Sequence, residues 1–205
     1  MGLSAEALTA GVDALASLEP GFALALTRCG YPAPRIRPRG YATLLRTIIG
    51  QQVSVLAADA VWRKLEATVG DPADPATIAA ASDEQLRAAG LSRQKSGYAR
   101  SLADEVTGGR LDLAALPADD EEAIAALTRI KGIGRWSAEI YLLFAEGRPD
   151  IWPAGDLAVQ IEIGRILGYD ERPSEKRTRE LAEAWRPHRG AAAIFAWHSY
   201  QTKVL

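Results

Sequence analysis

Segments of helix-forming residues fill most of this 205-residue chain, and short breaks rich in glycine and proline separate them. Strand-like alternation of apolar and polar residues is missing except at residues 35–37. Typical helix-capping residues precede several segments, among them Ser4, Ser82 and Asp119, and the last two have a Gln or Glu three residues later. The pattern predicts an all-α fold. The expected helices are 4–17, 20–28, 41–49, 53–69, 75–80, 83–89, 93–106, 120–127, 135–145, 157–168, 175–185 and 190–203.

One of these segments, 53–69, carries apolar residues at helical spacing over its whole length. We therefore expect it to be a central helix, with Trp62 in the core. The apolar positions are Val53, Ala57, Ala60, Val61, Leu65 and Val69.

Composition and charge narrow the class of protein. There is no basic, apolar leader and no apolar run near the ~20 residues of a membrane span, so a cytoplasmic protein without membrane attachment is expected. The single cysteine, Cys29, excludes an internal disulfide and a cysteine-rich metal site. The net charge is −2. However, no acidic residue lies between Glu19 and Asp59, and this stretch is either a DNA-facing surface or an ordinary solvated one. Its basic residues are Arg28, Arg35, Arg37, Arg39 and Arg46.

A tight Gly-x-Gly turn joins two expected helices at residues 132–134. Glycine allows positive φ and lets another backbone approach closely, and the amides at the start of the next helix then face an anion. The residues expected to bind phosphate are Lys131, Gly132, Ile133, Gly134 and Arg135. An ordinary corner between two helices is the alternative.

Asp156 follows a glycine and opens the next expected helix. A carboxylate held in a fixed position at a helix start can stabilise positive charge that develops beside it during a reaction. Aspartate is also a favoured N-cap residue, so Asp156 has a catalytic and a capping interpretation, and both can hold together.

These motifs resemble the helix-hairpin-helix (HhH-GPD) DNA glycosylases, and among them the 3-methyladenine DNA glycosylase II, or AlkA-type, enzymes. The resemblance runs from about Tyr41 to Trp197. The segments that carry it are 43–58, 86–95, 127–139, 152–156 and 185–197.

The resemblance implies roles for particular residues. Asp156 would be the catalytic carboxylate. Bifunctional relatives have a Schiff-base lysine at the position of Trp136, so a purely hydrolytic enzyme is implied. The base pocket would be formed by Trp136, Trp197, Ile140 and Trp152, with Ile140 in place of a tyrosine of the AlkA relative. For the two tryptophans 136 and 197, core packing is the alternative.

The resemblance also implies a DNA wedge and a cation. Gln52, with Gln51, would fill the gap left by a flipped base, unless the two only cap the following helix. The backbone carbonyls of Thr128, Ile130 and Gly132 would hold a monovalent cation, Na⁺ or K⁺. No other cofactor is expected, because the cysteines that bind an iron–sulfur cluster in related enzymes are missing.

The whole chain, 1–205, is expected to form one glycosylase domain with two helical lobes, a compact variant without the N-terminal β domain of larger relatives. One lobe would span about 41–150 and the other 1–40 with 151–205. The expected partner is double-stranded DNA with damaged bases, bound by a monomer associated with the bacterial nucleoid. The expected reaction is hydrolytic release of 3-methyladenine and 7-methylguanine. The alternatives are a same-fold enzyme for deaminated or oxidised bases and a non-catalytic protein that binds alkylated DNA.

Overall fold

A computed structural model describes residues 2–202, and within this range every regular element is a helix. There are twelve α-helices, one π-helical turn and one 3₁₀ turn, so the predicted all-α class is confirmed. Residues 35–37 do not form a strand. The Arg37 amide donates a backbone hydrogen bond to the Phe144 carbonyl over 2.8 Å. None of the described helices is long and apolar enough to cross a membrane.

The chain divides into two compact units. We call the first the terminal unit; it contains the chain up to Arg37 and from Leu142 onward. The second, the central unit, is Pro38–Tyr141. Each unit is described separately below.

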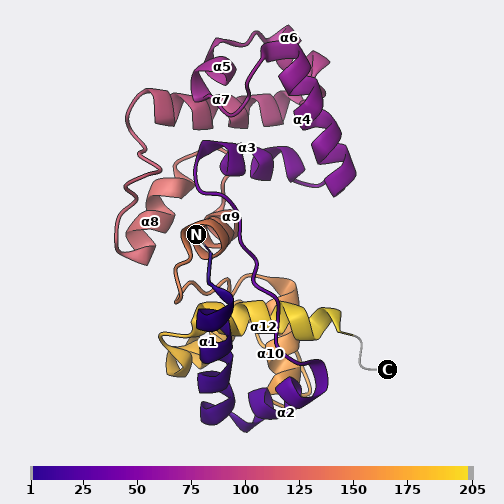
Figure 1. The fold of residues 1–205 in the computed structure, drawn as a ribbon, viewed down its shortest axis with the longest axis vertical. Coiled ribbons are helices and arrows are strands. Elements are labelled where there is room, and N and C mark those ends of the chain that lie inside the picture. Colours follow the sequence, from indigo (N-terminus) through magenta and orange to yellow (C-terminus); the bar gives the residue numbers. More distant parts are fainter. Residues whose placement is uncertain (1, 203–205) are drawn as a thin grey trace. The chain divides into compact units, whose positions relative to one another are not determined.

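The terminal unit is built around its last helix, α12, in which every residue from Gly190 to Trp197 is buried. A helix that is apolar on all sides belongs in the middle of a unit, and α12 packs against α1, α2 and α10 (Figure 1). A side chain at Gly11 of α1 would overlap Ala191, so these helices touch through small residues. The helices are α1 (Ala5–Leu18), α2 (Pro20–Cys29), α10 (Leu157–Ile166), α11 (Glu175–Ala182) and α12 (Arg189–Gln201).

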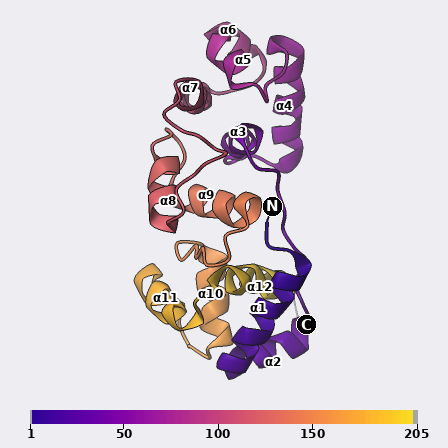
Figure 2. The ribbon, with the colours of Figure 1, turned by 60° about the vertical axis from the view of Figure 1, so that its left-hand side comes forward.

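The central unit is organised around α3, whose apolar residues are almost all fully buried. Helix α3 packs against α4, α7 and α9, and α7 in turn packs against α5 and α6 (Figure 2). The helices are α3 (Tyr41–Gly50), α4 (Val55–Val69), α5 (Pro75–Ala80), α6 (Asp83–Ala88), α7 (Arg93–Thr107), α8 (Asp120–Thr128) and α9 (Arg135–Tyr141).

Side-chain caps set most of the helix starts, as the sequence predicts. Ser4 caps α1, and Ser82 forms a complete capping box with Gln85 at the start of α6. Asp119 caps α8 through a hydrogen bond from the Glu122 amide to its Oδ1, 2.9 Å long. Satisfying these otherwise unpaired amides fixes where each helix begins.

Helix α4 corrects the sequence prediction in two respects. It begins at Val55 rather than at residue 53, because Ser54 is its N-cap. It is also peripheral instead of central, since only Trp62 and Leu65 are buried, although the core position predicted for Trp62 is confirmed. Alanine and valine at the remaining apolar positions are small enough to tolerate partial exposure. Their helical spacing therefore did not indicate how deeply the helix is buried.

Two predicted helices end in tighter or wider turns. The segment predicted as one helix over 135–145 is α9 followed by a π-helical turn at Leu142–Glu146. The segment predicted over 175–185 is α11 followed by a 3₁₀ turn at Glu183–Trp185.

Candidate active site and nucleic-acid interface

Asp156 is the N-cap of α10, and two hydrogen bonds converge on one of its carboxylate oxygens. The Val159 amide donates to Oδ1 over 3.0 Å, and Trp197 Nε1 donates to the same oxygen over 3.1 Å. The capping interpretation is therefore confirmed, and it coexists with a carboxylate whose direction is fixed. The preceding loop is itself anchored, because Gln160 Nε2 donates to the Ala154 carbonyl over 2.6 Å.

Trp197 lies on α12 and is only 7% exposed. Besides its bond to Asp156, its ring is 5.6 Å from the ring of Phe144, tilted by 58°. The guanidinium carbon of Arg35 lies 5.5 Å from the centroid of the indole. Trp197 is thus both a partner of the carboxylate and one half of an aromatic pair.

Two arginines of the segment between α2 and α3 lie against that aromatic pair. Arg35 is on Trp197, and the guanidinium carbon of Arg37 is 5.7 Å from the centre of the Phe144 ring. Burial is the main cause that lowers the pKa of Arg35; the charge of Arg37 adds to it and the charge of Asp156 opposes it. The sequence showed only a basic stretch here, and no motif indicated that these arginines would lie on Trp197 and Phe144.

Trp152, predicted to line the base pocket, is a core residue of the terminal unit. Its indole Nε1 donates to the Thr178 carbonyl over 3.1 Å, and its ring packs edge-on against Trp185 at 5.6 Å. Because its N–H is hydrogen-bonded and its ring is packed in the core, Trp152 anchors the start of the loop that leads to Asp156.

The other two predicted pocket residues lie on α9 in the central unit. Trp136 is 47% exposed, which is unusual for an indole, whereas Ile140, one turn later, is buried. The predicted pocket residues therefore come from both units, and the structure describes each group within its own unit.

The turn between α8 and α9 is a tight hairpin, as predicted. Gly132 has φ of 86°, and a Cβ there would overlap the ring of Tyr98 on α7, so glycine is required for two reasons. Ile133 is buried and anchors the turn, while the surroundings of Gly134 are open. The Lys131 amide donates to Ser101 Oγ over 3.0 Å, so any phosphate contact of Lys131 would use its exposed ammonium group.

Arg135, also predicted to bind phosphate, is engaged by two carboxylates. Its guanidinium donates to Glu121 over 2.8 Å and to the buried Glu139 over 2.9 Å. The hydrogen bonds and charges of these carboxylates raise the pKa of Arg135. Its positive charge is thus balanced within the protein, which leaves Lys131 as the stronger candidate for a phosphate contact.

The turn between α3 and α4 separates the two glutamines predicted to form the wedge. Gln51 points into the unit and donates from Nε2 to the Gly132 carbonyl of the hairpin over 2.8 Å. Gln52 is exposed and has φ of 56°, the one positive φ among the described non-glycine residues. Lys95 Nζ holds the end of α3 through a 2.7 Å bond to the Ile49 carbonyl. Gln51 therefore stabilises the turn through its bond to the hairpin, and Gln52 is the glutamine whose side chain is exposed to solvent.

The start of α4, next to Gln52, carries an apolar surface. Val55 is 78% exposed and Leu56 is 81% exposed, the highest values for large apolar side chains among the described residues. The apolar spacing of the sequence did not indicate this exposed pair. Val55 and Leu56 are the first two residues of α4, directly after its N-cap, Ser54.

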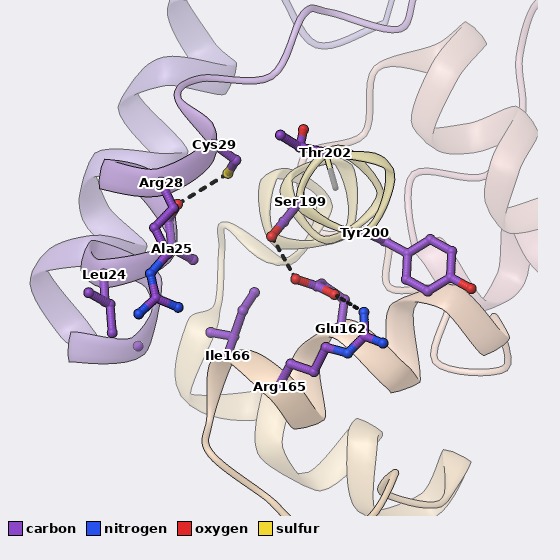
Figure 3. Close-up of a pocket in the computed structure, with 11 residues that line it drawn as sticks. Leu24, Ala25, Arg28, Cys29, Glu162, Arg165, Ile166, Ser199, Tyr200 and Thr202 are labelled. Atoms are coloured by element: carbon purple, nitrogen blue, oxygen red, sulfur yellow. Dashed lines mark hydrogen bonds and ion pairs between the residues drawn. The ribbon is translucent and has the colours of Figure 1, made fainter. Parts of the chain in front are cut away.

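A separate cavity of about 520 Å³ lies in the terminal unit between α2, α10 and α12 (Figure 3). In it the Ser199 hydroxyl donates to the buried Glu162 over 2.6 Å, and Arg165 bonds the other carboxylate oxygen over 3.3 Å. Burial raises the pKa of the Cys29 thiol at its edge. None of the residues predicted from the sequence as site residues lines this cavity.

The hairpin, the capped aspartate and the helical fold together define a family. The chain belongs to the HhH-GPD superfamily of base excision DNA repair proteins, whose model matches residues 45–187. The family predicted from the sequence motifs is therefore confirmed.

Individual proteins extend the likeness over nearly the whole chain. A DNA-3-methyladenine glycosidase from Bacillus halodurans has a similar structure, with a TM-score of 0.85, 31% identity and coverage of 94% of this chain and 89% of that one. The 3-methyladenine DNA glycosylase Mag1 of Schizosaccharomyces pombe, solved with abasic DNA, gives 0.77 and 28%, covering 95% and 97%.

Sequence relatives agree with the structural ones. DNA-3-methyladenine glycosylase 1 of Schizosaccharomyces pombe is 31% identical over 161 residues, which cover 77% of this chain and 71% of that protein. The chain spans 59% of the length of a Bacillus subtilis relative that it matches over 169 residues.

Proposed function

We propose that this protein is a monofunctional DNA glycosylase that releases alkylated purines, 3-methyladenine and 7-methylguanine, from double-stranded DNA. The observation that carries the proposal is the carboxylate of Asp156, whose Oδ1 is held by the Val159 amide and the Trp197 indole. Relatives named as DNA-3-methyladenine glycosylases and a relative solved with abasic DNA support the substrate class.

The chemistry needs little beyond a fixed negative charge. The bond between C1′ and the base nitrogen breaks with its electron pair leaving on the base, so a cationic alkylpurine departs as a neutral molecule. Positive charge develops on the sugar, and the Asp156 carboxylate stabilises it. A water oxygen then forms the new bond to C1′ and gives up its proton, which leaves an abasic site.

Trp136 accounts for the absence of a second, strand-cleaving step in this proposal. An indole has no amine that could attack the sugar and form a Schiff base, unlike the lysine at this position in bifunctional relatives. The enzyme would therefore stop at the abasic site.

The hairpin and the wedge turn would hold the DNA. Lys131 would contact a phosphate near the Gly132–Gly134 turn, and Gln52 would fill the gap left by the flipped base. The carbonyls of Thr128, Ile130 and Gly132 would hold Na⁺ or K⁺; the Gly132 oxygen already accepts a hydrogen bond from Gln51 but has a second lone pair. We further propose that the protein acts as a monomer in the bacterial cytoplasm, without any other cofactor.

The test is release of free base from duplex oligonucleotides that each contain one modified base. Single-turnover release of 3-methyladenine or 7-methylguanine well above the spontaneous rate, with an intact abasic strand left behind, is the expected result. Borohydride added during the reaction should trap no covalent adduct. Binding without base release would contradict the proposal and favour a non-catalytic sensor of alkylated DNA.

A further inference from the structure

Arg35 places a positive charge where the proposed function needs a base to bind. Its guanidinium carbon is 5.5 Å from the centroid of the Trp197 indole, and Trp197 is the residue that bonds Asp156. The side chain is half-buried, and its end is held by Gln201, whose Oε1 accepts a hydrogen bond over 3.3 Å. The neighbouring backbone is held as well, by the bond from the Arg37 amide to the Phe144 carbonyl.

This arrangement has consequences for a cationic base. The Arg35 guanidinium, 5.5 Å from the indole centroid, already makes the cation–π interaction that a methylated purine would make with the same ring. Two positive charges within a few ångströms of each other repel, most strongly in a partly buried site where water screens them poorly. Arg35 therefore works against cationic bases at Trp197.

For a neutral base the same charge acts in the opposite direction. A neutral purine takes on negative charge as its glycosidic bond breaks, because the bond's electron pair stays on the ring. Arginine presents several N–H donors in a plane, and donors placed where charge develops lower the barrier for the reaction. Arg35, which lies against Trp197, carries the charge and the N–H donors that stabilise such a leaving group.

We propose that Arg35 is a specificity-determining residue that promotes release of neutral purine lesions and disfavours release of cationic ones. The inference rests on the proposed glycosylase function and deepens it, since it names the class of base that this chain accepts beyond methylated purines. Cationic bases are still released by the wild-type enzyme, because their glycosidic bonds are intrinsically weak.

The experiment compares two lesions at one position of the same duplex: 7-methylguanine, which is cationic, and hypoxanthine, which is neutral. Single-turnover rates are divided by the spontaneous loss rate of each base. Arg35→Met keeps the length and apolar stem of the side chain but removes the charge. We expect it to slow hypoxanthine release about tenfold and to change the 7-methylguanine rate less than threefold or to raise it.

Two variants separate this effect from others. Arg35→Lys keeps the charge and should keep the hypoxanthine to 7-methylguanine ratio within about threefold of wild type. Arg37→Met removes a neighbouring charge that lies on Phe144 instead, so any general loss of DNA attraction should affect both lesions equally. If Arg35→Met fails to fold, as judged by thermal unfolding, the lysine variant and Arg35→Gln give the same comparison.

The outcomes distinguish this inference from the proposed function. Equal slowing of both lesions by Arg35→Met, or an equal shift of the ratio by Arg37→Met, would overturn the role of Arg35 while leaving the glycosylase intact. A wild-type protein that releases neither base would overturn the proposed function itself.

Discussion

At the scale of single residues, one oxygen atom of Asp156 combines two functions that the sequence left as alternatives. This oxygen accepts the capping hydrogen bond from the Val159 amide of α10 and a second hydrogen bond from Trp197 Nε1. The bond that caps the helix therefore also helps to fix the direction of the carboxylate. Rigid positioning matters because electrostatic stabilisation of a transition state depends on groups that need no reorganisation during the reaction.

Replacing Asp156 by Asn tests this combination. The amide oxygen of Asn can still accept both hydrogen bonds, so the free energy of unfolding should change by less than about 1 kcal/mol. The negative charge is lost, and single-turnover base release should fall about 10²–10³-fold, as for the loss of one preorganised group. Asp156→Ala should be equally inactive but also less stable, by about 1 kcal/mol. Activity of Asp156→Asn within a few-fold of wild type would show that the carboxylate is only a cap.

At the scale of elements, the turn between α3 and α4 shows how a functional surface is held in place. Gln51 ties this turn to the hairpin by a hydrogen bond to the Gly132 carbonyl. The next residue, Gln52, has a left-handed backbone conformation that residues other than glycine rarely adopt. Strain of this kind persists where the surrounding structure imposes it, often at functional sites.

Two substitutions of Gln52 separate strain from function. Gln52→Gly relieves the left-handed backbone, whereas Gln52→Ala keeps the strain, so the glycine variant should be more stable than the alanine variant by about 1 kcal/mol. Both lack the wedge, and both should lose more activity on duplex than on single-stranded DNA, where no gap needs filling. Thermal unfolding and single-turnover rates on the two substrates give these comparisons. Equal losses on both substrates would assign Gln52 a structural role only.

The elements also show what the sequence could predict. Most helix starts, though not that of α4, followed from local capping chemistry, and the hairpin followed from two glycines and their flanking residues, so these features were predicted. The depth of α4 was not, because apolar spacing identifies a face but does not say what covers it. The hydrogen bond from Gln51 to Gly132 and the cation–π contact of Arg35 with Trp197 join residues 81 and 162 positions apart, and nothing in the local sequence signals them. The core role of Trp152 was missed for the same reason.

At the scale of the whole molecule, a net charge of −2 limits attraction to DNA, so the positions of cations that are not paired with carboxylates matter. Many arginines in the described range are paired with carboxylates, as Arg135 is with Glu121 and Glu139. Phosphate contacts then depend on position more than on the total number of basic residues.

Lys131 and Arg135 should therefore differ, although they flank the same turn. Lys131→Ala should reduce the slope of log affinity against log salt by about 1, as expected for one phosphate contact, and leave stability unchanged. Arg135→Ala should leave the slope nearly unchanged but lower the free energy of unfolding by about 1–3 kcal/mol, because the buried Glu139 loses a charged partner. Binding titrations at several salt concentrations and denaturant unfolding measure the two effects. The reverse pattern would show that Arg135 is the phosphate ligand.

The exposed indole of Trp136 gives the molecule a built-in optical reporter. Four of the five tryptophans are buried and Trp136 is not, so a collisional quencher such as iodide should reach about one fifth of the intrinsic fluorescence emitters. If Trp136 meets DNA, a duplex should shield that fraction, and the loss of quenching should follow the binding curve without any label. Trp136→Phe should abolish the quenchable fraction in the absence of DNA. Quenching that DNA leaves unchanged would place this indole away from the bound duplex.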